Sequence, residues 1–560
     1  MPFPDRPYIY EINTRVWLTA LSRKYSKTIT LSSIPDEDLD WIAERGFNVV
    51  WMMGAWQRSP AARRSALNYV HEYRPALPDM SEADVTGSPY AIYDYTIDRE
   101  MGGRRGMAAL RVRLARRNIA LMLDFVPNHM ATDSPWIAET PGLFVQGSVR
   151  DYARDDFGLF QAHDAWGRTV YICRGRDPYF PPWIDTAQLN AFSPALRERV
   201  IEVLLDIAEQ CDGVRCDMAM LMTHRVFEQT WSHYVGDLPQ REYWQAVIPV
   251  VRDHYPDFVF TAEVYWDMEY ELQQMGFDYT YDKRLYDRIL EGDAEKVRLH
   301  LLADVNFQHK MVRFLENHDE HRAADKLDGQ RQPMAAVAVF TLPGAMLLFD
   351  GQLTGSKVKL PVQLGRAPDE PVDEGLLLFY SKLFEELRHP IYEQGEWWLL
   401  DLKAGWETQP NTYHLLAHGW QQVARQEYRL IVVNMGAQPT QGTVRLDAWR
   451  NLLGSGWLLT DVMAEHTYER QGDNLVHSGL YVELPAYGFQ ILRFEPIHAT
   501  VILPEDESDR IDMEIAIGGF EEEISHLLGQ EVKATEAHTE AVFAEQRGKK
   551  AHKRSSEDGR

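Results

Sequence analysis

The chain has 560 residues, 45% of them hydrophobic and 11% aromatic, and a formal net charge of −26 at pH 7. This length exceeds what one hydrophobic core usually serves, so we expect one large domain with one or two smaller ones. The negative charge repels phosphate backbones and anionic lipids, which disfavours nucleic acids and membrane surfaces as partners, whereas a neutral sugar is unaffected.

The N-terminal segment, MPFPDRPYIYEIN, lacks a charged stretch followed by an apolar one. No window approaches the roughly 18 apolar residues of a membrane-spanning helix. The three cysteines are an odd number, and two of them, Cys211 and Cys216, flank a predicted buried strand. This pattern favours packing over a disulfide framework. We therefore expect a cytoplasmic protein.

Short apolar runs alternate with amphipathic helical stretches from the N-terminus to about residue 390. Such alternation is typical of a parallel sheet wrapped by helices. Eight strands are expected, which makes a closed (β/α)8 TIM barrel over residues 1–390 the simplest architecture. The expected strands span residues 8–12, 49–53, 120–125, 213–217, 258–263, 277–281, 311–315 and 345–349.

Two helices have readable ends. Ser193 followed by Pro194 predicts a cap and a first helical turn, leading into an apolar stripe. In SSIPDEDLDWIAERG, Ser33 and Asp36 have the spacing of a capping box, and Gly46 is expected to end the helix.

Three further segments depart from the barrel pattern. Residues 130–192 are rich in Asp, Gly, Pro and aromatics, and predict a subdomain inserted after the third strand, over the barrel mouth. Residues 391–496 change to short alternating segments, which predict a C-terminal antiparallel β domain. Residues 497–560 are dominated by charged and small residues and predict a flexible tail, with a docking element as the alternative.

Acidic residues follow four of the apolar runs. Reactive groups of a parallel barrel lie at the C-terminal ends of its strands, and here Asp124, Asp217, Glu263 and Asp319 occupy such positions. A single acid there is more often a helix cap or a satisfied hydrogen-bonding group. Four on one rim indicate a site, and glycosidic cleavage needs two carboxyls, about 5 Å apart when one of them is a nucleophile.

The neighbours of these acids suggest their roles. Arg215 precedes Asp217 by two residues, so both side chains point to the same face of a strand, and the guanidinium is expected to keep Asp217 ionised. Glu263 has no such cation in its strand and is followed by Val, Tyr and Trp, surroundings that raise the pKa of a general acid. A purely structural salt bridge between Arg215 and Asp217 is the alternative.

These residues resemble the four short sequence regions of the α-amylase family of retaining glycoside hydrolases and transglycosidases (glycoside hydrolase family 13). The regions lie in the family's order at the ends of the third, fourth, fifth and seventh expected strands. The resemblance extends over roughly residues 6–495. The four matching segments are DFVPNH (124–129), GVRCD (213–217), AEVYW (262–266) and ENHDE (316–320).

The resemblance implies a role for each matching position. Asp217 would be the nucleophile, Glu263 the acid and then the base, and Asp319 the residue that binds substrate hydroxyls and helps to distort the ring. The resemblance also implies four substrate-binding residues and a supporting role for Asp124 behind the nucleophile. The substrate-binding residues would be Tyr90 as a stacking platform, His129 and His318 as hydrogen-bonding partners, and Arg215.

Two features of the family's pattern are altered or incomplete. Many relatives follow the nucleophile with small residues and a Lys-His pair, whereas Met218, Ala219, Met220 and Leu221 stand here, which leaves specificity on the leaving-group side open. The family's common calcium site draws on the asparagine that corresponds to Asn128. The six to eight oxygen ligands of calcium are not identifiable, so calcium remains an open alternative and no cofactor is required.

The predicted function is a retaining α-glycoside hydrolase that acts on the α-glucosidic bonds of malto-oligosaccharides or α-glucans by double displacement. Two alternatives stay open. A transglycosidase, isomerase or phosphorolytic enzyme would intercept the same glycosyl enzyme with a sugar or phosphate in place of water. A non-catalytic sugar-binding protein would use the same barrel without chemistry.

Overall fold

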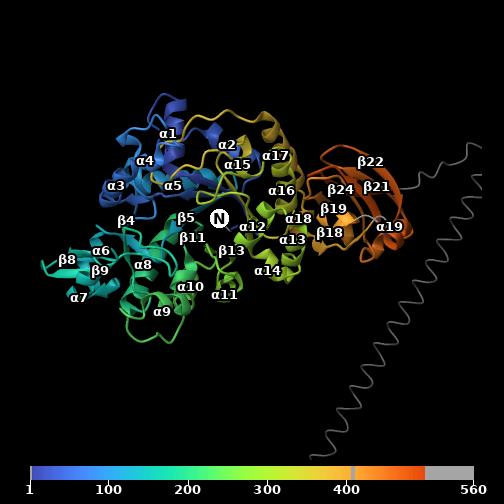
Figure 1. Ribbon diagram of the computed structural model, residues 1–560. Coiled ribbons are helices and arrows are strands. Elements are labelled where there is room, and N and C mark those ends of the chain that lie inside the picture. Colours follow the sequence, from blue (N-terminus) through green and yellow to red (C-terminus); the bar gives the residue numbers. More distant parts are fainter. Residues whose placement is uncertain (1–2, 405–409, 498–560) are drawn as a thin grey trace, which may run out of the picture. The chain divides into compact units, whose positions relative to one another are not determined.

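Eight parallel strands close into a barrel in the computed structural model, which describes residues 3–404 and 410–497 (Figure 1). The predicted (β/α)8 barrel is confirmed, and each of the eight expected strands is present. The strands are β1 (Tyr8–Asn13), β2 (Val49–Met53), β5 (Ala120–Phe125), β11 (Gly213–Cys216), β12 (Val259–Ala262), β13 (Tyr279–Tyr281), β14 (Met311–Arg313) and β15 (Ala345–Phe349).

The strands beneath the acidic residues end earlier than predicted. Strand β11 ends at Cys216 and β12 at Ala262, so Asp217 and Glu263 stand one residue beyond them. The ladder continues through both backbones, since the N–H of Asp217 donates to the carbonyl of Phe125 and that of Glu263 to the carbonyl of Cys216, at 2.8 and 3.0 Å. Both side chains are thus fixed at the rim by the strands they follow.

The barrel strands are apolar because helices cover their outer side and packed side chains fill the interior. All residues of β2, β5 and β15 are buried. Gly344, just before β15, has a φ of +105°, and a Cβ there would lie 2.4 Å from the carbonyl oxygen of Met311, so only glycine fits. The helices between the strands include α1 (Thr14–Lys24), α2 (Asp36–Glu44), α5 (Gly103–Ala115), α8 (Pro194–Gln210), α10 (Tyr243–His254), α12 (Lys283–Glu291), α16 (Arg331–Phe340) and α17 (Glu374–Leu387).

One predicted helix start is confirmed and the other is wrong. The Ser193 side chain accepts from the N–H of Leu196 and caps α8, with Pro194 in the first turn. Helix α2 begins after Pro35 without a side-chain cap, because the Ser33 hydroxyl instead bonds to the backbone of Thr30. Gly46 has a φ of +86° just after the end of α2, as its sequence position predicts.

The expected insertion follows the third barrel strand. Its base is the antiparallel pair β6 (His129–Ala131) and β10 (Thr186–Gln188), and a three-stranded sheet lies between them in sequence. That sheet contains β7 (Gln146–Gly147), β8 (Leu159–His163) and β9 (Thr169–Cys173), flanked by α6 (Pro135–Glu139) and α7 (Val149–Arg154). Strand β6 begins at His129, so the insertion starts five residues after Asp124.

The predicted C-terminal antiparallel β domain is also present. It comprises a six-stranded and a three-stranded sheet. The indole N–H of Trp420 donates to the carbonyl of Thr341 at the end of α16, 2.7 Å away, which joins this domain to the barrel. The predicted tail from residue 498 onward lies outside the described residues. The strands are β16 (Glu396–Leu399), β18 (Leu415–Gln422), β19 (Glu427–Asn434), β21 (Gly456–Asp461), β22 (Thr467–Gln471) and β24 (Phe489–Ile497) in the larger sheet, and β17 (Leu402–Ala404), β20 (Thr440–Val444) and β23 (Leu480–Leu484) in the smaller one.

The cysteines are packing residues, as predicted. Cys173, Cys211 and Cys216 are all buried and free of disulfide bonds. Among the described residues, no helix combines the length and apolar character needed to traverse a bilayer.

Candidate active site

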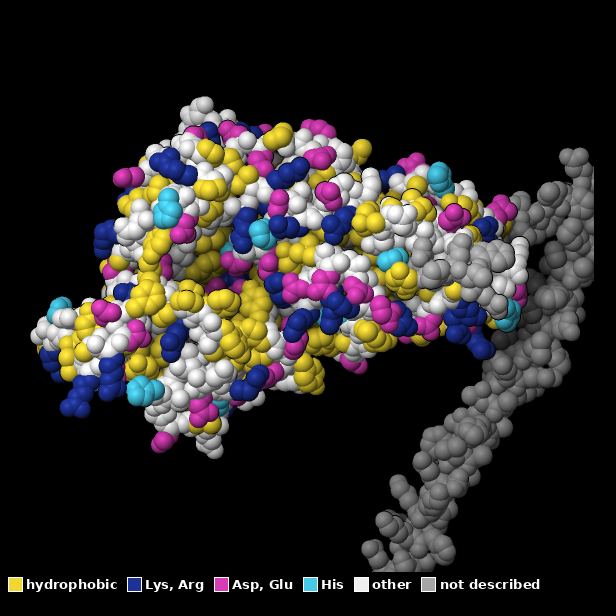
Figure 2. Space-filling view, viewed as in Figure 1, with side chains coloured by type: hydrophobic (Ala, Val, Ile, Leu, Met, Phe, Trp, Pro, Cys, Tyr) yellow, Lys and Arg dark blue, Asp and Glu magenta, His cyan; other side chains and the backbone are white. Residues whose placement is uncertain are grey.

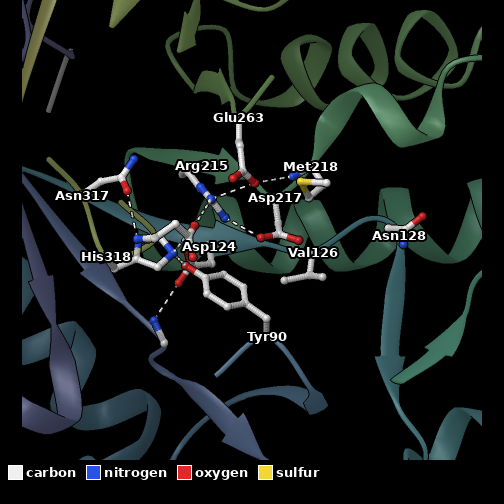
Figure 3. A network of polar contacts seen from close by, with 12 residues as sticks. Tyr90, Asp124, Val126, Asn128, Arg215, Asp217, Met218, Glu263, Asn317 and His318 are labelled. Atoms are coloured by element: carbon white, nitrogen blue, oxygen red, sulfur yellow. Dashed lines mark hydrogen bonds and ion pairs between the residues drawn. The ribbon is translucent and has the colours of Figure 1, made fainter. Parts of the chain in front are cut away.

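The guanidinium of Arg215 lies beside the carboxylates of Asp217 and Glu263 at the C-terminal ends of the barrel strands (Figure 3). Nη1 of Arg215 lies 2.6 Å from Oδ1 of Asp217, and Nη2 lies 2.8 Å from Oε2 of Glu263. Nη2 also lies 3.8 Å from Oδ2 of Asp319. The strands β11, β12 and β14 therefore bring the three predicted catalytic residues together around Arg215.

Arg215 is completely buried among aromatic rings. Its guanidinium carbon lies 5.3 Å from the ring centres of Trp51 and Tyr90 and 5.8 Å from that of Tyr281. Burial alone would lower its pKa, but the charge of Glu263 and other anionic neighbours raise it well above its ordinary value. Arg215 is therefore a permanent cation that fixes the positions of the carboxylates.

Glu263 has donors on both carboxylate oxygens. The hydroxyl of Tyr265 donates to Oε1 at 2.7 Å, and the backbone N–H of Met218 donates to Oε2 at 2.6 Å. Met218 adopts a φ of +42°, which non-glycine residues rarely adopt and which turns this N–H toward Glu263. The acid is thus held in one orientation by groups from two loops.

The pKa of Glu263 rises to about 7. Burial is the main cause, Arg215 opposes it, and the nearby charges of Asp217 and Asp319 raise it further. The sequence prediction of a raised pKa is in line with this value, and β12 carries no cation, as noted, but Arg215 on the neighbouring strand β11 contacts Glu263 as well as Asp217. A cation on the neighbouring strand cannot be found by inspecting the strand of Glu263 alone.

The pKa of Asp217 is also raised from its ordinary value. Burial outweighs the opposing charge and hydrogen bond of Arg215, and Asp319 and Asp124 add to the rise. The contact between Arg215 and Asp217 was predicted correctly, and Arg215 favours the ionised carboxylate as expected. The sequence revealed the cation but not the near-complete burial of Asp217, which is only 6% exposed.

Asp319 belongs to a chain of charges that ends at a buried acid. Nε2 of His318 lies 2.9 Å from Oδ2 of Asp319, and Nδ1 lies 2.5 Å from Oε1 of Glu11. Burial lowers the pKa of His318, but Asp319 and Glu11 together raise it to about 10, so the imidazole is charged at neutral pH. Desolvation alone would raise the pKa of Asp319, but the neighbouring charges of His318 and Arg215 lower this pKa to about 2.

Asp124 lies next to the cluster but its oxygens are already used. Oδ1 accepts from the indole N–H of Trp51 at 3.1 Å, and Oδ2 accepts from the N–H of Gly54 at 2.7 Å. It is paired in register with Arg215, and burial raises its pKa to about 6. These contacts agree with a supporting position behind Asp217.

Tyr90 contacts His318, whereas His129 packs against the insertion. The Tyr90 ring stacks on that of His318 with centres 5.3 Å apart, and its hydroxyl lies 2.7 Å from Nε2 of His318. His129 lies against the ring of Trp183 from the insertion, 5.2 Å away, and burial lowers the pKa of His129 to about 4. His129 is therefore neutral, whereas His318 is charged.

Asn128 lies apart from the group formed by Arg215, Asp217 and Glu263 (Figure 3). The amide nitrogen of Gln188 lies within hydrogen-bonding distance of three oxygens, Oδ1 and the carbonyl oxygen of Asn128 at 2.9 Å and the carbonyl oxygen of Leu189 at 3.0 Å. Gln188 is fully buried. These oxygens already face an amide donor, so the residues here do not fit a calcium ion. Within residues 3–404 and 410–497 no group of three or more His, Cys, Asp or Glu side chains could hold a metal.

Sequence reasoning missed Glu11 and Tyr265 as members of the site. Glu11 is a charged residue within the otherwise largely apolar strand β1, and this contrast was an available signal. Tyr265 was noted only as apolar surroundings of Glu263, because its hydroxyl contact depends on the turn that follows. Hydrophobic side chains also gather on the face drawn in Figure 2, around a hollow between the regions of β4 (Ile92–Ile97) and β11 that contains acidic side chains.

The chain resembles known proteins in sequence. Residues 30–370 match the family described as "Alpha amylase, catalytic domain". Alpha-amylase 3 of Dictyoglomus thermophilum is 23% identical over 316 residues, 54% of this chain and 59% of that protein. Alpha-amylase MalA of Haloarcula japonica is 25% identical over 389 residues, 67% of this chain and 47% of that protein. This chain therefore spans about half the length of the curated relatives it matches.

The fold also resembles solved structures. A noncanonic maltogenic alpha-amylase, AmyB from Thermotoga neapolitana, matches 88% of this chain and 99% of its own with a TM-score of 0.63 and 19% sequence identity. At this identity the match concerns the fold alone.

Proposed function

Because the chain belongs to the α-amylase family, we propose that it is a retaining hydrolase of α-glucosidic bonds in malto-oligosaccharides or α-glucans. The observation that carries the proposal is the contact of one guanidinium, that of Arg215, with Asp217 at 2.6 Å and Glu263 at 2.8 Å. Retaining cleavage needs two close carboxyls in different protonation states. The two directly follow the neighbouring strands β11 and β12 and share this cation.

Asp217 is the proposed nucleophile. It would attack the anomeric carbon as the bond to the leaving oxygen breaks, and a β-glycosyl enzyme would form. The attacking carboxylate must be ionised, and Arg215 stabilises that form against burial. Burial in turn strips the carboxylate of water, which leaves its free oxygen available to the sugar.

Glu263 is the proposed acid and base. Its pKa of about 7 keeps a protonated form of Glu263 accessible at neutral pH, and this proton would pass to the leaving oxygen. The resulting carboxylate would then take a proton from the water that attacks the glycosyl enzyme. The N–H of Met218 and the hydroxyl of Tyr265 favour the carboxylate form and hold its orientation.

Asp319 is the proposed partner of the sugar hydroxyls. With its pKa lowered to about 2 it remains an acceptor at neutral pH, beside the charged donor His318. Tyr90 is the proposed platform under the sugar ring, and Arg215, His129 and His318 complete the substrate-binding residues. Asp124 and Asn128 are the proposed supporting residues, with Asp124 behind the nucleophile.

Product analysis by proton NMR tests the proposal. The purified protein is incubated with maltose, malto-oligosaccharides, trehalose, sucrose and glycogen, each with and without phosphate. Initial release of the α-anomer of glucose or of short oligomers supports a retaining hydrolase. Formation of longer chains, isomers or sugar phosphates would show that the enzyme catalyses transfer and not hydrolysis. Release of the β-anomer would contradict a retaining mechanism.

A further inference from the structure

A basic cleft of about 470 Å³ lies between α1, the segment 57–63 and the segments on either side of β4. Its volume is typical of small-molecule sites, which span about 300 to 1,000 Å³. The residues that line it are distinct from the proposed catalytic and substrate-binding residues. Its charged residues are four arginines and two acids, namely Arg15, Arg58, Arg63, Arg99, Asp98 and Glu100.

One arginine pairs with both acids of the cleft. Nη2 of Arg15 lies 2.6 Å from Oδ2 of Asp98, and Nη1 lies 2.7 Å from Oε2 of Glu100. The other three arginines form no ion pair within residues 3–404 and 410–497. The cleft therefore has a surplus of two positive charges, although the whole chain has a net charge of −26. Such a local surplus attracts a small anion against the overall charge of the chain.

Arg58 is the buried cation of the cleft, with only 7% of its surface exposed. Its Nη1 donates to the carbonyl oxygen of Gly87 at 3.0 Å and to the hydroxyl of Thr86, which fixes the side chain. In the described part of the chain, its Nε and Nη2 are buried without a hydrogen-bond partner. A buried cation that has neither a counter-charge nor a full set of acceptors is costly, so its presence calls for an explanation.

Arg58 remains a cation at neutral pH in spite of this burial. Burial lowers its pKa to about 9, the like charge of Arg15 lowers it further, and the charge of Asp98 opposes both. Because Asp98 is already paired with Arg15, it does not form an ion pair with Arg58. The positive charge of Arg58 is therefore available to an anion in the cleft.

Arg63 and Arg99 are the exposed cations of the cleft. Nε of Arg63 donates to the carbonyl oxygen of Val85 at 2.8 Å, and Nη2 donates to that of Glu82 at 2.9 Å. These carbonyls orient the guanidinium without neutralising its charge. The Arg99 side chain has no hydrogen bond or ion pair among the residues that the structure describes. Both guanidinium groups can therefore donate to a ligand.

The cleft also has neutral polar groups and room beyond a single small anion. Oε1 of Gln57 accepts from the hydroxyl of Thr96 at 3.0 Å, which leaves the amide N–H groups of Gln57 as donors. A second cleft of about 420 Å³ shares Arg15 and Glu100 with the first and adds Arg23 and Lys27. A ligand with a hydroxylated carbon skeleton beside its anionic group would fit this surface.

We propose that the cleft binds a phosphate group, free or on a small ester such as a sugar phosphate, between Arg58, Arg63 and Arg99. The phosphate supplies the counter-charge that Arg58 lacks. Its oxygens also match the fork of N–H donors that a guanidinium presents. The site is separate from the rim carboxylates, so the proposal does not depend on the reaction at Asp217 and Glu263.

Titration calorimetry with the full chain tests the site. Inorganic phosphate and glucose 6-phosphate are titrated separately in a phosphate-free buffer at constant ionic strength. Both should bind saturably. Tighter binding of glucose 6-phosphate would assign the site to the ester, and equal affinities would show that the phosphate group alone is recognised.

Variants of the three arginines locate the bound phosphate. Arg63→Gln and Arg99→Gln should each weaken the binding of inorganic phosphate about three- to tenfold, because each removes one charged donor. Arg58→Met should weaken it at least about tenfold, because this cation is buried and its attraction is least screened by water. If Arg58→Met does not fold, the two exposed arginines still decide the outcome.

Arg64→Gln is the matched control. Arg64 follows Arg63 in α3 (Pro60–Ala66), is exposed and does not line the cleft, so this variant removes the same charge from the same helix. Phosphate affinity should stay within about twofold, since an exposed charge outside the site is screened. The proposal would be overturned by the absence of saturable phosphate binding, by binding that persists unchanged in the cleft variants, or by an equal loss in Arg64→Gln.

Discussion

Two arginines are fully buried in the barrel, and their surroundings differ. Arg215 on β11 faces three carboxylates, those of Asp217, Glu263 and Asp319. Arg313 on β14 forms an ion pair with one carboxylate, that of Asp282, and bonds to the side chain of Gln308. Both sites therefore contain a buried cation. They differ in the number of carboxylates around it, three at Arg215 and one at Arg313.

The carboxylate oxygens also differ in what else they bind. Oδ1 of Asp282 caps α12 by accepting from the N–H of Leu285 at 3.0 Å, and Oδ2 lies 3.0 Å from Nε2 of His300. In the described part of the chain, the Asp217 carboxylate bonds only to Arg215. An acid whose oxygens cap a helix serves the fold, whereas one with a free oxygen at the rim can meet a substrate.

The largest expected effect is a loss of catalysis when the pair of Arg215 and Asp217 is broken. Asp217→Asn removes the proposed nucleophile, and kcat should fall at least about 1,000-fold. The side chain keeps its size and loses a buried charge whose pKa burial had raised, so the unfolding free energy should change little. Steady-state kinetics and urea unfolding measure both quantities. Near-normal turnover would exclude Asp217 as the nucleophile.

Breaking the pair of Arg313 and Asp282 should instead lower stability and leave catalysis largely unchanged. Asp282→Asn leaves Arg313 buried without a counter-charge, so the unfolding free energy should fall by about 3 to 5 kcal/mol. Where the variant remains folded, kcat should stay within a few-fold of the original, because Asp282 does not belong to the rim cluster. A large loss of kcat with unchanged stability would show that the comparison between the two arginines is mistaken.

The pH dependence sharpens the same comparison. The proposed acid acts when protonated, and its folded pKa of about 7 lies above the ordinary value, so kcat/KM should fall as pH rises through about 7. Glu263→Gln should abolish this alkaline limb, and its activity should be lost mainly on maltose rather than on an activated aryl glucoside. An alkaline limb that persists in Glu263→Gln would have to come from another group.

A smaller effect is expected at Tyr265. Its hydroxyl donates to Oε1 of Glu263, which favours the carboxylate, so Tyr265→Phe should move the alkaline limb upward by up to about one pH unit. Rates should fall less than about tenfold, because Met218 and Arg215 still orient the acid. A purely structural role would lower kcat at all pH values without moving the limb.

The sequence predicted the parts of this molecule that depend on local pattern. Eight apolar runs gave the eight barrel strands, and acids at their ends gave Asp217, Glu263 and Asp319, because strand direction alone carries such residues to one rim. The shared contact of Arg215 with Glu263 was missed, since it depends on the pairing of β11 with β12. Likewise, the raised pKa of Asp217 depends on burial by the surrounding loops.

The sequence also did not predict the backbone conformation of the turns after Asp217 and Glu263. Nothing in the residue types at 218, 266 and 267 predicts a positive φ, because Met, Trp and Asp all avoid or seldom adopt it. The turn at Met218 points its N–H toward Glu263, and the turn at Trp266 places its ring 5.0 Å from that of Tyr179. Tertiary contacts such as the ion pair between Arg284 and Asp267 depend on the folded chain, so the sequence indicated the acids at the strand ends more readily than the turns that follow them.

The smallest expected effect is that of calcium. The neutral amide of Gln188 lies where the family's pattern suggests a calcium ion. The Gln188 amide faces oxygens of Asn128 and Leu189 at the base of the insertion, so it supplies the donors that a bound metal would otherwise replace. Removal of calcium with a chelator should therefore leave the thermal midpoint unchanged, as should added calcium. By contrast, Gln188→Ala should cost about 1 to 3 kcal/mol of unfolding free energy, because it leaves buried oxygens without a donor. A fall in the thermal midpoint on chelation, restored by calcium, would show that a metal holds this junction and that the amide does not take its place.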